Sequence, residues 1–345
     1  MKYSFANDYS EGCHPRILEA LAHTNLIQQA GYGDDSHTCN ASDTIRRLAG
    51  NTDIDVHMVA GGTMANLVVL ASVLRPFESV VAATTGHIYT NEAGAIEATG
   101  HKVEAAPTVD GKLRPADIVP FLNKARGHHL VRTRAVYISN STELGTVYTK
   151  QELIDLYEFS KANNLILFMD GARLPMALTA PSNDLTLADI ARYTDVFYIG
   201  GTKCGAMLGE AIVISNPDLK QDFKYHLKQR GALSAKGRTI GIQFEQLLQD
   251  NLIFELADHA NKMASRLACA FKQLGCPLLI DSDTNQLFPV LSNAMITLLQ
   301  KDYGFLIWSV VDEDRSAVRL ITSWATPERV VDEFIKDLRR VYSVK

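Results

Sequence analysis

Between residues 52 and 215, short apolar runs alternate with segments whose apolar residues recur at helical spacing. The apolar runs predict strands at residues 56–60, 79–84, 102–106, 134–139, 165–169, 195–199 and 210–214. The segments between them predict helices at residues 64–74, 90–99, 115–126 and 149–163. Elements in this order form a mostly parallel sheet with helices on both faces. The pattern therefore predicts an α/β fold with a mostly parallel seven-stranded sheet between helices.

The predicted helix at residues 149–163 has the clearest start. Thr149 and Glu152 have the spacing of a capping box, in which each side chain accepts a hydrogen bond from the backbone of the other residue. Leu153 and Leu156 then keep one face of the helix apolar. The run that follows, at residues 165–169, is apolar throughout, which is typical of a strand buried on both faces of a parallel sheet.

After about residue 236 the pattern changes. Residues 238–274 predict one long helix or two in tandem, without strands. The remainder predicts an apolar run at 287–291, a helix at 293–303, a hairpin joining 305–311 to 317–324, and a last helix from residue 327. We therefore expect a large domain at residues 1–240 and a smaller C-terminal α+β domain at residues 241–345.

The composition narrows the class of protein. With 345 residues, of which 46% are hydrophobic and 21% charged, the chain has an ordinary globular composition and enough length for two packed regions. A net charge of −5 without a basic block argues against a nucleic-acid partner. No signal peptide or membrane span is expected, and the five cysteines lack the spacing of a disulfide framework or a metal site. These features predict a cytoplasmic enzyme without a metal or a membrane partner.

Two predicted strands end in side chains suited to catalysis. Residues 165–169 lead into Asp170-Gly-Ala-Arg173, and residues 195–199 lead through two glycines to Lys203. Ligands of parallel sheets bind beyond the carboxyl ends of the strands, so we expect these side chains in one crevice. The set suits pyridoxal 5'-phosphate (PLP), which forms a Schiff base with a lysine and pairs its pyridinium nitrogen with an aspartate. The alternatives are that Asp170 only caps a turn and that Lys203 lies in solvent.

Gly61-Gly-Thr63 lies between a predicted strand and a predicted helix. Backbone amides at the helix start, together with the Thr63 hydroxyl, could hold a phosphate group. Alternatively, Thr63 is a simple N-cap residue and the glycines allow a tight turn. The glycine spacing matches neither a Walker loop nor a dinucleotide-binding fingerprint.

Two further residues each have two interpretations. His87 follows a predicted strand, where its imidazole could stack on a cofactor ring and exchange a proton with substrate, or could lie at the surface. Arg319 lies between apolar residues of the predicted hairpin. Its guanidinium could form a salt bridge at the rim of the sheet or hold a substrate carboxylate in a bidentate manner.

Together these motifs resemble the fold-type I PLP-dependent enzymes with a transferase-like fold, and most closely the L-threonine aldolases of low-specificity type in the aromatic amino acid β-eliminating lyase superfamily. The resemblance covers nearly the whole chain, and the ordered series of motifs is specific. In family order the motifs are Asn7-Asp-Tyr-Ser10, Gly31-Tyr-Gly-Asp-Asp35, Gly61-Gly-Thr63 with Ala65-Asn66, His87 with Asn91-Glu-Ala-Gly94, Asp170-Gly-Ala-Arg173, and Thr202-Lys203.

The resemblance implies a role for each site residue. Lys203 would be the Schiff-base lysine, Asp170 would bind the pyridine nitrogen, and His87 would stack on the ring. The phosphate would be held by Gly61, Gly62, Thr63 and Thr202. Arg173 would contact both cofactor and substrate, and Arg319 would hold the substrate carboxylate together with Asn7 or Ser10. Arg238 would reach the phosphate of a neighbouring subunit. The family forms its sites at dimer interfaces, so a homo-oligomer, usually a tetramer built as a dimer of dimers, is implied.

The implied activity is that of an aldehyde-lyase, which cleaves L-threonine, L-allo-threonine or a similar β-hydroxy-α-amino acid to glycine and an aldehyde by a retro-aldol reaction. The base on the β-hydroxyl would be His87, Glu92 or a water molecule. One segment departs from the family. After the strand near residue 139 an Asn-Thr-His sequence is expected, whereas this chain has Asn140-Ser-Thr-Glu143, with Thr142 where the histidine should stand.

This departure leaves a second enzymatic reading open. A PLP-dependent β-eliminating amino acid lyase, which releases pyruvate and ammonia, would use the same cofactor residues. A non-enzymatic nucleotide-binding module based on Gly61-Gly-Thr63 is a third reading. It leaves Asp170 and Lys203 without a role.

Overall fold

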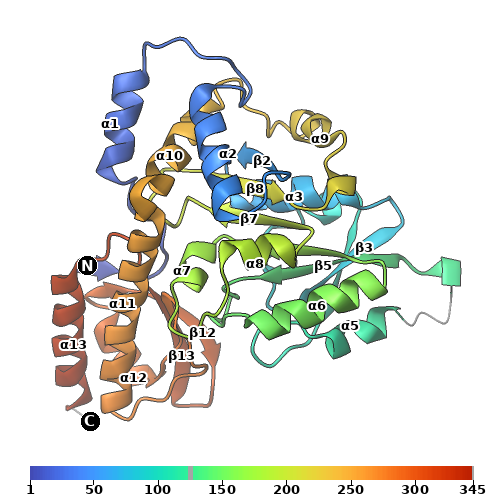
Figure 1. The fold of residues 1–345 in the computed structure, drawn as a ribbon. Coiled ribbons are helices and arrows are strands. Elements are labelled where there is room, and N and C mark those ends of the chain that lie inside the picture. Colours follow the sequence, from blue (N-terminus) through green and yellow to red (C-terminus); the bar gives the residue numbers. More distant parts are fainter. Residues whose placement is uncertain (123–126, 344–345) are drawn as a thin grey trace.

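A seven-stranded sheet lies at the centre of the computed structural model, which describes residues 1–122 and 127–343 (Figure 1). The strand order is β2-β8-β7-β6-β5-β3-β4, and all pairings are parallel except those of β8, which runs antiparallel to both neighbours. This confirms the predicted mostly parallel seven-stranded sheet. The strands are β2 Asp55–Val59, β3 Glu78–Ala83, β4 Lys102–Ala106, β5 Arg132–Ser139, β6 Ile166–Asp170, β7 Val196–Gly200 and β8 Glu210–Ile214.

Side chains that alternate along each strand pack into two separate cores. Leu167 and Phe197 belong to one core, whereas Phe168 and Tyr198, each one residue further on, belong to the other. Helices cover both faces because each face is apolar. On the first face lie α2 Ser36–Leu48, α6 Lys150–Ala162, α8 Leu187–Arg192 and α10 Arg238–Leu248; on the second lie α3 Gly62–Val73 and α9 Phe223–Gln229. Figure 1 shows α6 and α8 crossing one face of the sheet.

The helix α6 begins as its sequence predicts. The hydroxyl of Thr149 accepts a hydrogen bond from the backbone of Glu152, and the Glu152 carboxylate accepts one from the backbone of Thr149. The predicted strand after it is also confirmed, as β6. The described part of the helix predicted at 115–126 is α5 Pro115–Leu122, and residues 123–126 lie outside the described residues.

The helix predicted at residues 90–99 is wrong. Two short helical turns, α4 His87–Thr90 and η1 Glu97–Thr99, occupy this region, and they are separated by a loop. Ala93 and Gly94 have positive φ angles of 50° and 75°, which a right-handed helix does not accommodate. The loop places Glu92 in the interior, 6% exposed.

The C-terminal part contains a second sheet, at the lower left of Figure 1. Its strands are β9 Gln286–Leu287, β10 Val290–Ser292, β12 Leu306–Val310 and β13 Arg315–Ile321, and the predicted hairpin of β12 with β13 is confirmed. The helix predicted at 293–303 is shorter, as α12 Asn293–Leu299. β11 Tyr303–Gly304 follows it and pairs with β1 Tyr3–Ser4. α13 Glu328–Tyr342 completes this part.

The long helical region predicted at 238–274 consists of two helices, α10 and α11 Leu252–Gln273, joined by the turn η4 Gln249–Asn251. α11 contributes Ala257 and Ala260 to the core beneath the large sheet, and Leu267 and Phe271 to the core beneath the small one. The division into residues 1–240 and 241–345 stays a prediction. Among the described residues, no helix combines the length and apolar character that a membrane span requires.

Candidate active site

A cavity of about 250 Å³ lies at the edge of the large sheet where the parallel strands end. It brings together most of the predicted site residues: Gly61, Gly62, Thr63, His87, Asp170, Arg173, Thr202 and Lys203. The lining does not include the other predicted residues, Asn7, Ser10, Arg238 and Arg319. Because β8 is antiparallel, it begins where its neighbours end, and its first residue, Glu210, also faces this cavity.

Two glycines allow Asp170 and Lys203 to approach one another. The amide of Gly200 donates a hydrogen bond of 2.9 Å to the carbonyl of Gly171. A Cβ atom on Gly171 would lie 1.7 Å from the carbonyl oxygen of Tyr198, and one on Gly200 would lie 2.3 Å from that of Ala172. Only glycine fits at either position, so the two loops that follow β6 and β7 touch through their backbones.

Asp170 is a buried carboxylate, 4% exposed, with several hydrogen-bond donors. Its Oδ2 accepts hydrogen bonds from the Tyr137 hydroxyl at 2.5 Å and from the Asn66 amide at 3.1 Å. Burial by itself raises the pKa of Asp170, but the nearby His87 and the donated hydrogen bonds outweigh burial and hold the pKa below its ordinary value. Asp170 is therefore ionised at neutral pH and suited to pair with a cationic nitrogen.

Lys203 is half-buried at the cavity wall, and its ammonium forms neither a hydrogen bond nor an ion pair with any described residue. Burial and the guanidinium of Arg173 lower the pKa of Lys203. A lysine with a lowered pKa has more of its amine in the neutral, nucleophilic form. These features distinguish Lys203 from a solvated surface lysine.

The imidazole of His87 is held by a carboxylate behind it. Nδ1 of His87 donates to Oε1 of Glu92 at 2.8 Å, and the same oxygen accepts a hydrogen bond from Nδ2 of Asn66 at 2.7 Å. Because Asn66 also donates to Asp170, a continuous set of hydrogen bonds connects His87 to Asp170. This network fixes the orientation of the imidazole ring at the cavity wall.

The N-terminus of α3 has free backbone amides. Gly61 is the N-cap residue, and no side chain accepts a hydrogen bond there. The alternative in which Thr63 is the N-cap is therefore wrong. Uncapped amides at the start of a twelve-residue helix favour an anion, as the phosphate interpretation requires. Across the cavity, the hydroxyl of Thr202 accepts a hydrogen bond of 3.0 Å from the amide of Gly209.

The two candidate carboxylate-binding arginines differ in their partners. Arg173 donates to Asp8 through Nε at 2.7 Å and Nη2 at 3.0 Å, and Asp8 is fully buried. Arg319 has no ion pair with a described residue, its buried Nε lacks a hydrogen-bond partner, and its guanidinium lies 5.3 Å from the centre of the Trp308 ring. Burial and the neighbouring Arg173 lower the pKa of Arg319. Arg319 is thus the guanidinium with donors to spare for a carboxylate.

The other predicted contacts have local partners. Oδ1 of Asn7 accepts hydrogen bonds from the Ser10 hydroxyl at 2.9 Å and from the Tyr9 amide at 3.0 Å, and only Tyr9 of these three lines the cavity. Arg238 donates to the carbonyl oxygens of Asn25 and Ile27. Their predicted roles toward substrate and toward a neighbouring subunit remain predictions.

Several polar residues of this site were not identified from the sequence alone. Tyr137, Tyr198 and Glu143 surround Asp170, and Asp8 fixes Arg173. The alternation of the strands could have indicated Tyr137. It pairs with Phe168 of the neighbouring strand, and Phe168 lies on the same face of the sheet as Asp170, two residues further on. No local signal joins Asp8 to Arg173, because 165 residues separate them.

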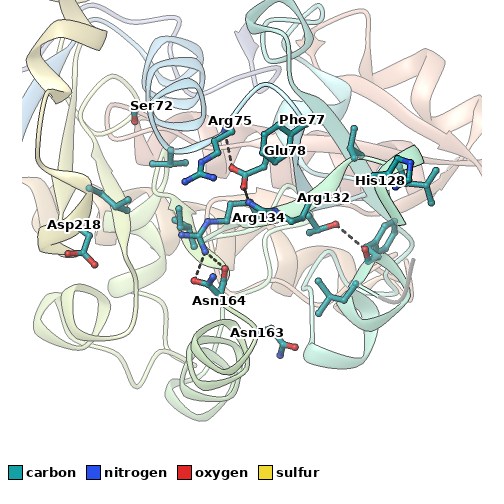
Figure 2. A pocket seen from close by; sticks show the side chains of 18 of the residues that line it. Ser72, Arg75, Phe77, Glu78, His128, Arg132, Arg134, Asn163, Asn164 and Asp218 are labelled. Atoms are coloured by element: carbon teal, nitrogen blue, oxygen red, sulfur yellow. Dashed lines mark hydrogen bonds and ion pairs between the residues drawn. The ribbon is translucent and has the colours of Figure 1, made fainter. Parts of the chain in front are cut away.

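A larger cavity of about 1010 Å³ lies at the opposite edge of the sheet, around the starts of β3 and β5 (Figure 2). Figure 2 shows the guanidinium of Arg132 beside Glu78 and that of Arg134 beside Asn164. Arg132 forms an ion pair with Glu78 and Arg134 donates a hydrogen bond to Asn164, so both guanidinium groups have partners within the protein. The cavity also lies away from the carboxyl ends where ligands of such sheets bind. We therefore assign the active site to the smaller cavity. Among residues 1–122 and 127–343, no cluster of three or more His, Cys, Asp or Glu side chains is arranged to hold a metal ion.

The fold and the site define the class of protein: a fold-type I PLP-dependent enzyme. The chain belongs to the beta-eliminating lyase family, whose model matches residues 8–294. It is 35% identical to a low specificity L-threonine aldolase of Pseudomonas aeruginosa, over 98% of this chain and 97% of that protein. A second such aldolase, from Pseudomonas sp., is 34% identical over 98% of both chains.

Solved structures agree with this assignment. A structure of Leishmania major threonine aldolase superposes with a TM-score of 0.97, at 52% identity and 99% coverage of both chains. An aspartate aminotransferase of Thermus thermophilus has a TM-score of 0.73 at 16% identity, over 99% of this chain and 91% of that one. At that identity it shows a shared fold only. The nucleotide-binding module is thereby set aside.

Proposed function

We propose that the chain binds PLP in the cavity at the end of the parallel strands and cleaves L-threonine or L-allo-threonine to glycine and an aldehyde. The observation that carries the proposal is Lys203, an ammonium of lowered pKa without a partner among the described residues, in the same cavity as the ionised Asp170. The names of the relatives, which are low specificity L-threonine aldolases, favour aldol cleavage over β-elimination.

The residues present fit PLP. Lys203 would link the aldehyde, Asp170 would pair with the pyridine nitrogen, and His87 would lie against the ring. The uncapped amides at Gly61, Gly62 and Thr63, with Thr202 opposite, would hold the phosphate. When bound, PLP supplies an electron sink for the pair released from the broken Cα–Cβ bond.

The other residues of the site bind and orient the substrate. Arg319 would hold the carboxylate with its unpaired guanidinium, and Arg173, fixed by Asp8, would add positive charge beside it. Asp170 keeps its negative charge because Tyr137 and Asn66 donate to it, and so would stabilise a protonated ring nitrogen. The hydrogen bond from Gly200 to Gly171 would hold the loop with Asp170 against the loop with Lys203.

Product analysis of the PLP-loaded protein with L-threonine and L-allo-threonine tests the proposal. We expect glycine and acetaldehyde in equal amounts. A 2-oxo acid with ammonia, or pyruvate from a three-carbon substrate, would identify β-elimination instead. Lys203→Ala should lose at least about a thousandfold in rate, because the step that releases the product amine loses its nucleophile. Acetaldehyde formation by that variant at the wild-type rate would exclude the assignment of Lys203.

We also propose that the protein is a cytoplasmic homo-oligomer, a dimer of dimers in which Arg238 contributes to a neighbouring site. The cysteines support a reducing compartment, since Cys13, Cys39, Cys204 and Cys269 form no disulfide bond. Apolar residues near Arg238 support an interface: Leu26 is 93% exposed and Ile27 is 53% exposed. Light scattering should give the mass of a tetramer, and mixing Arg238→Ala with Lys203→Ala protein should restore part of the activity if sites are shared.

A further inference from the structure

The segment that departs from the family pattern brings a carboxyl group into the active-site cavity. Glu143 lines the cavity together with His87 and Lys203. Thr142, which stands where the family resemblance implies a histidine, is fully buried and does not line the cavity. Its hydroxyl is hydrogen-bonded to the hydroxyl of Thr146 at 2.7 Å. Of the residues in this segment, Ser141 and Glu143 line the cavity, and Glu143 is the one with an ionisable side chain.

A rigid turn presents Glu143 to the cavity. The Thr142 hydroxyl accepts hydrogen bonds from the amides of Leu144 at 3.3 Å and Thr146 at 3.2 Å. The Thr142 carbonyl accepts one from the Gln286 side chain at 3.0 Å. These bonds fix the backbone on both sides of Glu143, as positioning of a catalytic side chain requires.

The two oxygens of the Glu143 carboxyl differ. Oε1 accepts hydrogen bonds from the Ser139 hydroxyl at 2.7 Å and from the His87 amide at 2.9 Å. No other described residue donates a hydrogen bond to Oε2, and Oε2 is not one of the fully buried polar atoms. Oε1 thus anchors the carboxyl, and Oε2 is left for a molecule that enters the cavity.

The surroundings of Glu143 suit a group that exchanges a proton with substrate. Burial and the carboxylate of Asp170 raise the pKa of Glu143, while the Ser139 hydroxyl and His87 oppose the shift. The guanidinium of Arg173 also interacts with Glu143. A carboxyl with a raised pKa is a stronger base once ionised and a better acid when protonated.

The other carboxylate near His87 has a different role. Oε1 of Glu92 is taken by His87 and Asn66, and Glu92 does not line the cavity. Glu92 is a positioning residue for the imidazole. Of the bases that the sequence suggested, Glu92 is thereby excluded from direct contact with substrate.

We propose that Glu143 is the catalytic base that removes the proton from the β-hydroxyl of the substrate. This rests on the proposed function. The hydroxyl proton moves to Oε2 of Glu143, and the electron pair of the O–H bond becomes the second C=O bond of the aldehyde. The Cα–Cβ bond breaks, its electron pair stays on Cα, and a proton added there completes glycine.

Glu143→Gln tests this role, because glutamine keeps the shape and can accept both hydrogen bonds at Oε1 but cannot take up a proton. We expect kcat for threonine cleavage to fall about 10²–10⁴-fold, the usual contribution of general base catalysis. Exchange of the glycine α-proton with deuterium, followed by NMR, should change less than about threefold, because glycine has no β-hydroxyl and needs no base there.

The pH dependence gives a second readout. In the wild type, log kcat/KM should rise with pH through the pKa of Glu143, since the base must be ionised, and this acidic limb should vanish in Glu143→Gln. Glu143→His should recover part of the rate, with an acidic limb near the pKa of an imidazole, about 6.5. Infrared titration of the protein without cofactor should show a protonated carboxyl band that Glu143→Gln lacks.

The outcomes separate the two proposals. Asp53→Asn, which changes an exposed carboxylate away from the cavity, should retain the wild-type rate. A Glu143→Gln protein that cleaves threonine at the wild-type rate would overturn the role of Glu143, as would equal loss of cleavage and of glycine exchange. If the wild type exchanges glycine protons and yet forms no aldehyde, the proposed function fails instead.

Discussion

The amide of Gly200 donates a hydrogen bond of 2.9 Å to the carbonyl oxygen of Gly171, and this contact joins the ends of two adjacent strands. Asp170 directly precedes one of these glycines, and Lys203 lies three residues beyond the other. The distance between the carboxylate and the ammonium thus depends on two positions that cannot carry a side chain. The following predictions test this arrangement and the charges around it.

Gly171→Ala should destabilise the fold. The added Cβ would lie 1.7 Å from the carbonyl oxygen of Tyr198, and this oxygen belongs to the backbone of the adjacent strand. We expect a loss of about 3 kcal/mol in the free energy of unfolding, measured with urea, together with weaker PLP binding. Gly12→Ala is the control, because no atom lies within 4 Å of its added Cβ. Equal stability of the two variants would show that the close contact is not needed.

Tyr137→Phe should raise the pKa of Asp170 and weaken PLP binding. The tyrosine donates a hydrogen bond of 2.5 Å to the carboxylate, and its loss should cost about 1–3 kcal/mol. Tyr148→Phe is the matched control. Its hydroxyl is equally buried but contacts Leu113, away from the cavity, so stability should fall without a change in PLP affinity. Affinity is measured by titration of the apoprotein with PLP, followed by absorbance.

Arg319→Leu should mainly raise KM. Its guanidinium has no ion pair among the described residues, and hydrogen bonds between charged groups contribute about 1.5–3 kcal/mol. This corresponds to an increase of about 10–100-fold in KM for threonine, with a smaller change in kcat. Arg315→Leu, in the same strand but exposed and paired with Asp312, should leave both parameters unchanged. A wild-type KM for Arg319→Leu would contradict its contact with the substrate carboxylate.

Asp8→Asn should destabilise the protein, because it leaves the buried guanidinium of Arg173 without its counter-charge. Breaking a buried ion pair costs about 3–5 kcal/mol. The control is Asp53→Asn, which removes the exposed partner of Lys220 and should cost less than about 1 kcal/mol. Thermal unfolding of both variants measures the difference.

The ion pair of Asp8 with Arg173 should also give stability a pH dependence. Burial raises the pKa of Asp8, but Arg173 and Lys203 outweigh it and lower the pKa below its ordinary value of 3.8. The pair therefore contributes fully above pH 3.8, and its contribution is lost as the pH falls through the lowered pKa of the folded state. In Asp8→Asn the free energy of unfolding should fall less steeply over this range. Identical acid profiles would show that Asp8 does not carry this dependence.

Most strands, and the helix that begins after Thr149, could be predicted from the sequence because their signals are local. Alternating apolar runs mark the strands, and the capping box marks the helix start. The helix predicted at residues 90–99 failed because burial of Glu92 beside His87 requires a loop with positive φ angles, which apolar spacing does not reveal.

The sequence by itself determined which residues stand at the ends of parallel strands, and hence that Asp170 and Lys203 line one cavity. Tertiary structure alone decided that Glu143 rather than Thr142 faces that cavity, that Asp8 neutralises Arg173, and that Arg319 is left unpaired. The reason is physical. Strand and helix patterns arise from neighbours along the chain, whereas the partner of a buried charge is chosen by packing, and here Asp8 and Arg173 lie 165 residues apart.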